Sequence, residues 1–290
     1  MSGITQEKDT PIKVDVDLVN VLATVYDKRG VLVTDLKQEE FEIREDGKPQ
    51  EIKYFARETS LPLTIALLLD VSGSVRRFID AEKETAARFL QEILRPQDRA
   101  LLMGFSSTIV LWQNFTASPV LLRANLEQLH PIPFRGIPLD GSPMPATLLY
   151  DAVYATAVDE LEGISGRKVM VIISDGLDNG STLHLDDAVR AVQSRNTVVY
   201  GICFTNGFSG CSFLKNIAEP TGGRMFELGT KAPLSKIFQT IQDELRSQYS
   251  LGYVPVNRAH DGTFRKLQIR VLRKDLKVDV RKGYYAYAEH

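Results

Sequence analysis

The middle of the chain, from Leu63 to about Arg246, alternates short apolar runs with amphipathic stretches. Continuous apolar runs bounded by turn residues are typical of strands that are buried on both faces, as in parallel sheets. Between the runs, apolar residues recur at helical spacing, for example from Ala86 to Leu94, just before Pro96. This alternation predicts an α/β fold with a doubly wound, mostly parallel sheet. The expected strands are 63–69, 101–105, 109–112, 169–173, 197–202 and 225–228, and the expected later helices open near Ser118, Thr147, Ser181 and Pro233.

Both flanks of this region instead alternate apolar and polar residues, which is the pattern of half-buried strands. The apolar parity changes between Leu18 and Val19, and Asp46-Gly47 predicts a hairpin turn. Each flank alone supplies too few strands for a stable two-layer core, whereas both together reach the roughly seven strands of an immunoglobulin-like sandwich. We therefore expect residues 1–60 and 249–290 to form one β-sandwich into which residues 61–248 are inserted. The alternative is that each flank separately extends the α/β sheet.

The apolar run 63–69 ends in a group of polar residues, Asp70-Val71-Ser72-Gly73-Ser74. In open α/β sheets, ligands bind at the carboxyl ends of the parallel strands. One carboxylate and two hydroxyls at alternate positions are hard oxygen ligands, which suit Mg²⁺ or a similar cation. The pattern is weak by itself, because Ser72 or Ser74 alone is more often the cap of a following helix.

Two further oxygen-bearing positions follow in the chain. The run 169–173 ends in Ser174-Asp175-Gly176, and Thr147 precedes a helical pattern that begins with Tyr150-Asp151-Ala152 after two leucines. Asp175 alone would be interpreted as a turn residue, and Thr147 alone as a helix start. Together, and in this order, the residues resemble the metal-ion-dependent adhesion site (MIDAS) of von Willebrand factor A domains: Asp70, Ser72, Ser74, Thr147 and Asp175.

That resemblance implies a cation site for Mg²⁺, with Mn²⁺ or Ca²⁺ as alternatives. The hydroxyls of the two serines and of Thr147 would reach the cation, and the aspartates would ligate it directly or through water. One coordination position would stay open for an Asp or Glu of a protein partner. Glycines often precede the threonine in that family, whereas this chain has Pro145-Ala146, which predicts a stiffer loop.

Both flanks carry a further set of residues: Asp15, Leu18, Val19, Val21, Asp35-Leu36, Phe41, Glu45-Asp46-Gly47, Tyr249-Ser250-Leu251-Gly252-Tyr253 and Arg281-Lys282-Gly283-Tyr284. This set resembles the von Willebrand factor A-related proteins of Acidobacteria. The resemblance spans nearly the whole chain and implies a bacterial protein of a family that is often exported, but it says little about function.

Charge and hydropathy exclude other kinds of partner. The formal net charge is −2 and the basic residues are dispersed, so no basic field favours nucleic acid. No apolar stretch approaches the roughly 20 residues that span a bilayer. The polar start from Met1 to Asp9 is not a secretory segment. We expect an extracytoplasmic protein, periplasmic or secreted, whose signal peptide is absent from this chain; a cytoplasmic protein is the alternative. The sequence leaves the oligomeric state open.

The two cysteines, Cys203 and Cys211, are separated by a loop that contains Gly and Asn. A small disulfide would form in an oxidising compartment, and two reduced thiols are the alternative. A zinc site is disfavoured because no His or further Cys stands nearby.

We expect a non-enzymatic module for adhesion-type protein–protein interaction that depends on the cation. One alternative is a structural domain with a vestigial metal site. Another is a metal-dependent, phosphatase-like hydrolase. Hydrolases of the haloacid dehalogenase type need a second Asp two residues after the first, and position 72 is Ser. The chain also lacks a Gly-rich phosphate loop with Lys-Ser or Lys-Thr.

Overall fold

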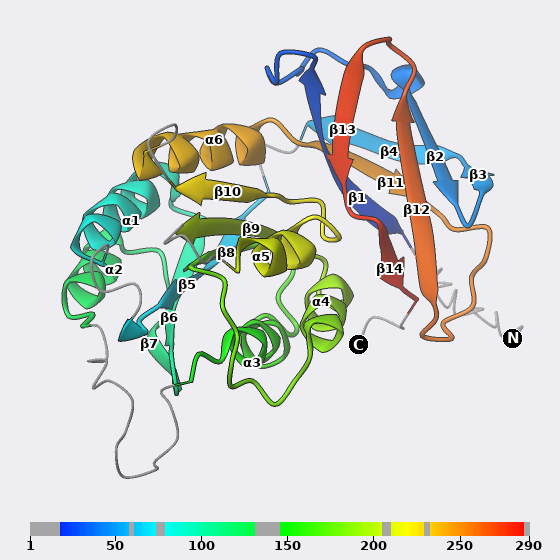
Figure 1. Ribbon diagram of the computed structural model, residues 1–290. Helices are drawn as coiled ribbons and strands as arrows, with labels where there is room; N and C mark the ends of the chain where they lie inside the picture. Colours follow the sequence, from blue (N-terminus) through cyan, green and yellow to red (C-terminus); the bar gives the residue numbers. More distant parts are fainter. Residues whose placement is uncertain are drawn as a thin grey trace, which may run out of the picture.

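One six-stranded sheet forms the centre of the α/β part of the chain (Figure 1). Its strand order is β10-β9-β8-β5-β6-β7, and all neighbours are parallel except β7, which runs antiparallel to β6. Every residue of β5 and β9 is buried, as expected where helices cover both faces. The strands are β5 (Leu63–Asp70), β6 (Arg99–Phe105), β7 (Ile109–Thr116), β8 (Arg167–Ser174), β9 (Thr197–Phe204) and β10 (Met225–Leu228). The computed structural model describes residues 18–57, 61–73, 79–130, 146–204, 210–228 and 233–286.

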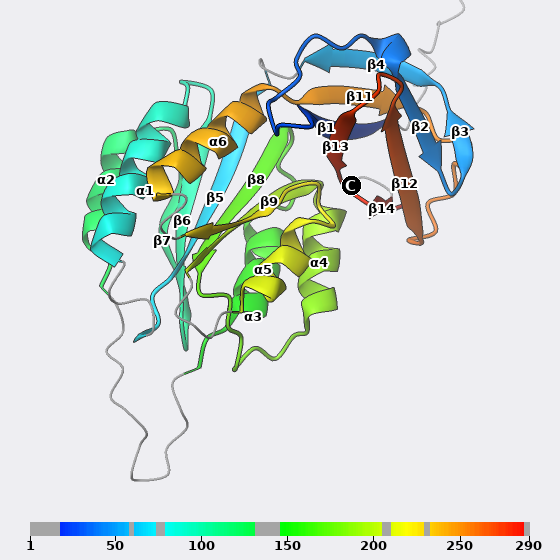
Figure 2. The ribbon, with the colours of Figure 1, turned by 45° about the horizontal axis from the view of Figure 1, so that its top comes forward.

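Among the described residues, three α-helices pack on each face of this sheet, and a short π-helical segment, η3 (Thr156–Glu160), continues one of them (Figure 2). On one face lie α1 (Ile79–Ile93), α2 (Pro119–Glu127) and α6 (Leu234–Arg246), where Phe89 stacks on Phe238 at 4.2 Å between ring centres. On the other lie α3 (Leu149–Ala155), α4 (Leu185–Ser194) and α5 (Cys211–Ala218). Within the described ranges, no helix has both the length and the apolar character that a membrane span requires. The doubly wound α/β prediction is confirmed.

The flanks form a β-sandwich of two four-stranded antiparallel sheets, ordered β13-β1-β11-β4 and β14-β12-β2-β3. Each sheet takes two strands from each flank, so the predicted shared sandwich is confirmed. In its core the Tyr249 ring lies 5.1 Å from the Phe41 ring, and its hydroxyl donates to the Val33 carbonyl at 3.0 Å. The strands are β1 (Val19–Asp27), β2 (Phe41–Glu45), β3 (Lys48–Gln50), β4 (Ile52–Arg57), β11 (Tyr249–Tyr253), β12 (Phe264–Val271), β13 (Leu276–Val280) and β14 (Gly283–Tyr285); a short 3₁₀ turn precedes β2.

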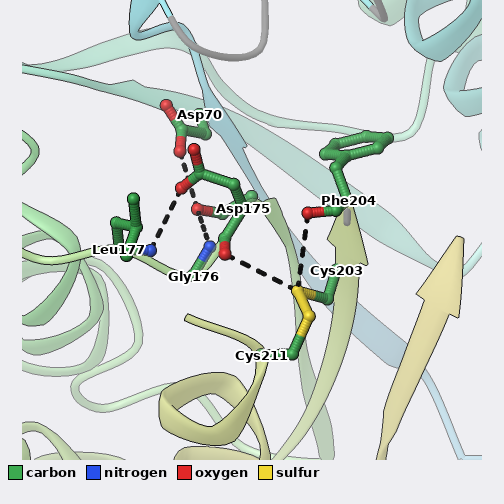
Figure 3. Close-up of a disulfide and its surroundings, with 8 residues drawn as sticks. Asp70, Asp175, Gly176, Leu177, Cys203, Phe204 and Cys211 are labelled. Carbon is green, nitrogen blue, oxygen red and sulfur yellow. Dashed lines mark hydrogen bonds between the residues drawn. A yellow bond between two sulfur atoms is a disulfide. The ribbon is translucent and has the colours of Figure 1, made fainter. Parts of the chain in front are cut away.

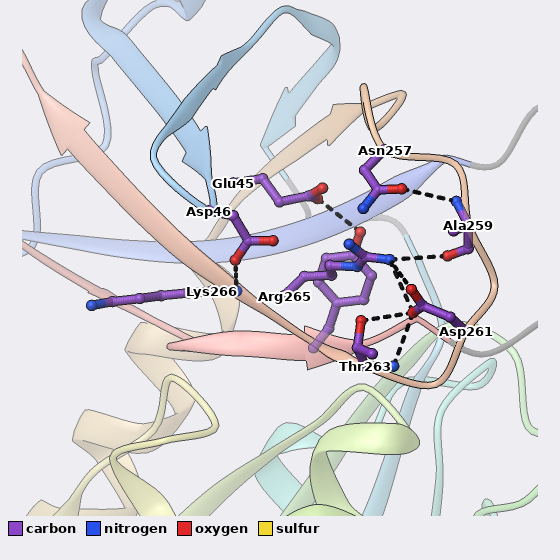
Figure 4. Close-up of polar contacts among 9 residues, drawn as sticks. Glu45, Asp46, Asn257, Ala259, Asp261, Thr263, Arg265 and Lys266 are labelled. Atoms are coloured by element: carbon purple, nitrogen blue, oxygen red, sulfur yellow. Dashed lines mark hydrogen bonds and ion pairs between the residues drawn. The ribbon is translucent and has the colours of Figure 1, made fainter.

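Polar contacts connect the sandwich strands with one another and with the loop between β11 and β12 (Figure 4). The Tyr253 hydroxyl donates to the buried Glu45 carboxylate at 2.6 Å. Nearby, Arg265 donates to both oxygens of Asp261 at 3.0 Å and to the Ala259 carbonyl at 3.2 Å. These contacts hold the loop between β11 and β12 against the strands.

The sandwich joins the α/β part at the amino ends of the parallel strands. Arg167, the first residue of β8, donates to the Leu245 carbonyl and to the Gln248 side chain at the α6–β11 link. On the sandwich side, the Lys282 N–H donates to the Pro220 carbonyl, 3.0 Å away. The carboxyl ends of the parallel strands therefore point away from the sandwich (Figure 1).

An ion pair with a buried carboxylate lies at this junction. Glu244 of α6 pairs with Arg224, whose guanidinium lies 5.0 Å from the ring centre of Tyr26 in β1. Burial raises the pKa of Glu244, and the Arg224 charge acts against that rise. Removing Arg224 would leave the Glu244 charge buried and uncompensated, and would also remove the contact with Tyr26 of the sandwich.

Two details of the helices differ from the sequence prediction. Helix α4 begins at Leu185 with His184 as its cap, so the helix predicted to open at Ser181 starts later. Helix α5 was not predicted at all. Residues 1–17 of the N-terminal flank and Pro145, in the loop before Thr147, lie outside the described residues, and the domain limits at 60/61 and 248/249 stay a prediction.

Deleting residues 1–57 should expose the C-terminal strands. The deletion removes β1 and β4, which flank β11, together with β2, the partner of β12. We expect trypsin to cut within 249–286 while 63–246 stays protected, as read by limited proteolysis and mass spectrometry. C-terminal strands that remain as protected as in the full chain would contradict a sandwich shared by both flanks.

Candidate metal centre

Two acidic residues meet at the carboxyl ends of β5 and β8. These strands are parallel neighbours in which Leu69 pairs with Ile173, so Asp70 comes beside Ser174 and Asp175. The Ser174 hydroxyl donates to Asp70 Oδ2 at 2.6 Å, and the Ser72 N–H donates to Asp70 Oδ1 at 2.9 Å. The carboxyl groups of Asp70 and Asp175 lie side by side (Figure 3).

Both carboxylates are removed from water: Asp70 is 1% exposed and Asp175 is 3% exposed. Burial raises the pKa of Asp70 to about 6, and the charge of Asp175 adds to the rise, while the hydrogen bonds from Ser174 and Ser72 oppose it. No lysine or arginine within the described part of the chain is ion-paired with either aspartate. Buried charges require a compensating partner.

A divalent cation fits this donor set. The predicted ligands are carboxylates and hydroxyls, the hard oxygen donors that Mg²⁺, Mn²⁺ and Ca²⁺ prefer. Over the described residues, no cluster of three or more His, Cys, Asp or Glu is arranged to hold a metal. A cation here would therefore rely on serine and threonine oxygens as well as on the two aspartates.

Thr147 is brought to the same edge of the sheet. It is 7% exposed and stands two residues before α3. Its N–H donates to Asn179 Oδ1 at 2.6 Å, and the Asn179 N–H donates to the Thr147 carbonyl at 3.3 Å. On the other side, the Leu148 N–H donates to the carbonyl of Ser106, which follows β6, at 2.9 Å. Thr147 thus lies between the loop that joins β8 to α4 (residues 175–184, the Asp175 loop) and the end of β6.

The structure therefore gathers four of the five predicted ligands at one edge: Asp70, Ser72, Thr147 and Asp175. Ser74 falls outside the described residues. Their role as metal ligands stays a prediction.

Three residues at this edge were missed by the sequence analysis as partners of the site: Ser174, Asn179 and Ser106. Ser106 is 2% exposed, and its hydroxyl has no hydrogen-bond partner among the described residues. Its place directly after an apolar strand is the same signal that drew attention to Asp70. Ser174 and Asn179 stand close to Asp175 in the sequence, but no spacing rule separates them from ordinary turn residues.

The Asp175 loop is also held from the side of α5. Cys203 and Cys211 form a disulfide, so the open choice between a disulfide and free thiols is settled in favour of the disulfide. The Gly210 N–H donates to the Asp175 carbonyl at 2.9 Å, and Cys203 Sγ contacts the same oxygen at 3.6 Å (Figure 3). A Cβ added at Gly176 would lie 2.4 Å from the Gly210 oxygen, so this approach of two backbones requires glycine.

The family model of the von Willebrand factor type A domain matches residues 64–240. The chain belongs to the von Willebrand factor A family. The match covers the six-stranded sheet and most of its helices, and leaves the sandwich strands outside.

Solved structures share the fold at low sequence identity. BatB, a conserved hypothetical protein from Bacteroides thetaiotaomicron, aligns with a TM-score of 0.51 at 13% identity, over 63% of this chain and 97% of that one. Proximal thread matrix protein 1 of the mussel byssus, solved with zinc in its MIDAS motif, aligns with a TM-score of 0.55 at 16% identity, over 69% of this chain and 49% of that one. A second structure of the mussel protein gives 0.53 at 14% identity, over 77% and 50%. The chain thus spans about half the length of the mussel protein. A comparison with curated proteins found no match.

Replacing Asp70 by Asn should stabilise the metal-free protein at neutral pH. The raised pKa means that folded wild-type protein holds more protons than unfolded protein between about pH 4 and pH 6, so its stability falls as pH rises through that window. Asn keeps the size of the side chain and removes the buried charge. In EDTA we expect the variant to gain about 2–3 kcal/mol at neutral pH and nothing near pH 4. Urea unfolding at both pH values measures this, and equal stabilities at neutral pH would contradict it.

Proposed function

We propose that the chain is a divalent-cation-dependent protein-interaction module that binds an acidic side chain of a partner. The cation would be held by Asp70, Ser72, Ser74, Thr147 and Asp175, with Mg²⁺ as the expected ion and Mn²⁺ or Ca²⁺ as alternatives. The observation that carries the proposal is the burial of Asp70 beside Asp175 without a basic partner among the described residues. The mussel protein, solved with zinc in its MIDAS motif, supports the binding of a divalent ion by a domain of this fold.

The residues at the carboxyl ends of β5 and β8 have different roles in the proposed site. Ser174 and the Ser72 N–H orient the Asp70 carboxylate through bonds of 2.6 and 2.9 Å. The hydroxyl ligands are neutral, so the protein supplies only two formal negative charges. A bound cation would supply a positive charge and an open position for the partner's carboxylate.

Apolar side chains beside the site support contact with a protein. Leu177 follows Asp175 by two residues and is 41% exposed, and Phe213 in the first turn of α5 is 39% exposed. The Phe213 ring lies edge-on to that of Tyr150, with 6.4 Å between ring centres. Aromatic and apolar side chains next to a charged anchor are typical of protein interfaces.

We also propose that the module works outside the cytoplasm and has no catalytic step of its own. The disulfide between Cys203 and Cys211 supports the location, because disulfides persist in oxidising compartments. Ser72, where a phosphatase of the haloacid dehalogenase type needs a second Asp, supports binding rather than hydrolysis.

Metal binding is tested by thermal unfolding with and without the ion. An ion that binds only the folded state stabilises it by about 2.7 kcal/mol at 100 times its Kd. We expect Mg²⁺ and Mn²⁺ to raise Tm over that in EDTA, and Asp70→Asn to abolish the rise. Asp98→Asn is the matched control, because Asp98 is also buried but accepts a bond from Leu63 at the opposite end of β5. A wild-type Tm unaffected by either ion would overturn the proposal.

Partner chemistry is tested with a displayed library of random peptides, panned on the protein in Mg²⁺ and eluted with EDTA. We expect the eluted peptides to contain an Asp or Glu whose exchange for Asn or Gln abolishes binding. Peptides should bind the Asp98→Asn control and fail to bind Asp70→Asn. Enriched peptides that bind equally well in EDTA would exclude a metal-bridged carboxylate.

A further inference from the structure

Helix α3, which follows Thr147, has no capping side chain of its own. Its N-cap residue is Leu148, and the first free N–H groups of a helix need acceptors. Those acceptors come from the loop after β8. Asp178 Oδ2 accepts from the Tyr150 N–H at 3.0 Å, and Ser181 Oγ accepts from the N–H groups of Tyr150 and Asp151 at 3.1 Å each. The Asp175 loop therefore caps the helix that begins two residues after Thr147.

Further bonds run in the opposite direction. Asp151 of α3 accepts from the N–H groups of Leu183 and Thr182 at 2.9 and 3.0 Å. The Ser181 hydroxyl in turn donates to Asp178 Oδ2 at 2.5 Å. The two segments are thus tied by side chains from both sides.

Asn179 adds the contact that reaches Thr147 itself. Its side chain accepts from the Thr147 N–H at 2.6 Å and its own N–H donates to the Thr147 carbonyl at 3.3 Å, so both backbone groups of Thr147 are bound to one residue. The next residue allows this approach, since a Cβ at Gly180 would lie 2.3 Å from the Ala146 Cβ. Asn179 itself is exposed, so its side chain contributes no core packing.

We propose that Asn179 is a positioning residue, which holds Thr147 against the Asp175 loop and thereby sets the metal affinity of the site. This inference rests on the proposed function. Asp175 and Thr147 belong to segments that are 28 residues apart in sequence, and the bonds of Asp178, Asn179 and Ser181 make them one unit. Without Asn179, the cation itself would have to order the Thr147 segment, and part of its binding free energy would be lost.

The test compares Kd values for Mn²⁺, measured by isothermal titration calorimetry on the full chain, for four proteins. Asn179→Ala removes the acceptor and should raise Kd about 10- to 100-fold, the range for residues that orient metal ligands. Asn179→Asp keeps an oxygen acceptor for the Thr147 N–H and should restore most of the wild-type affinity. Asn257→Ala is the matched control, because Asn257 makes the same kind of bond, to the Ala259 N–H at 3.2 Å, in the sandwich (Figure 4). Its Kd should equal that of wild type.

A second readout separates positioning from general stability. Tm in EDTA should fall little for Asn179→Ala, because the residue is exposed. If this variant loses Tm in EDTA but keeps the wild-type Kd, Asn179 is merely structural and the inference is overturned. If Asn179→Ala does not fold, Ser181→Ala replaces it. A raised Kd of Ser181→Ala for Mn²⁺ supports the positioning of Thr147 by this loop, and an unchanged Kd overturns it. A wild-type protein that binds no Mn²⁺ would refute the proposed function, and the inference with it.

Discussion

The parallel pairing of β5 with β8 is the constraint on which the site depends. Its register sets Leu69 opposite Ile173, so the first polar residues after both apolar strands emerge at the same place. Helices cover both faces of the sheet, and Asp70 at the end of β5 is only 1% exposed to solvent. The same burial that makes the sheet stable thus makes its acidic end unfavourable for charge, and a cation would remove that conflict.

The fold was predictable because its elements are specified locally. Apolar runs give buried strands, alternation gives the sandwich strands, and the strand-end position singled out Asp70 and Asp175. The sharing of one sandwich by the two flanks also followed, because neither flank has enough strands for a core, whereas the division of each sheet between the flanks was not predicted. Even the pairing of Cys203 with Cys211 was among the alternatives, since the loop between them is short.

What the sequence did not reveal depends on contacts between distant segments. Ser181 is a residue type that commonly caps the helix following it. In the structure it instead accepts hydrogen bonds from the N–H groups of Tyr150 and Asp151, at the start of an earlier helix. The wrong start for α4 has this cause, because a capping residue can serve any helix end within reach. Helix α5 was missed for another reason: it is short, and its apolar stripe of Leu214, Ile217 and Ala218 spans barely one turn. Asn179 lies in a segment whose sequence is typical of an ordinary turn, so its contact with Thr147 was not predicted.

The loop of Asp175 is held in two different ways. On the side of α3 it is held by side-chain hydrogen bonds, each of which contributes on the order of 1 kcal/mol and opens reversibly. On the side of α5 it meets the backbone of Gly210, next to a disulfide that ties the start of the helix to the end of β9. The disulfide fixes Cys211 beside Gly210, so we expect any adjustment of the site to take place on the side of Thr147.

The attachment of the sandwich at the amino ends of the strands has a mechanical consequence. A load between a partner held at the Asp70 edge and the sandwich would run along β5, which has parallel ladders to β6 and β8 on its two sides. Tension in this direction would shear the ladders, so their hydrogen bonds would have to fail together rather than one after another. If the proposed function holds, the chain would therefore resist pulling along β5 more strongly than peeling at the edge of the sheet.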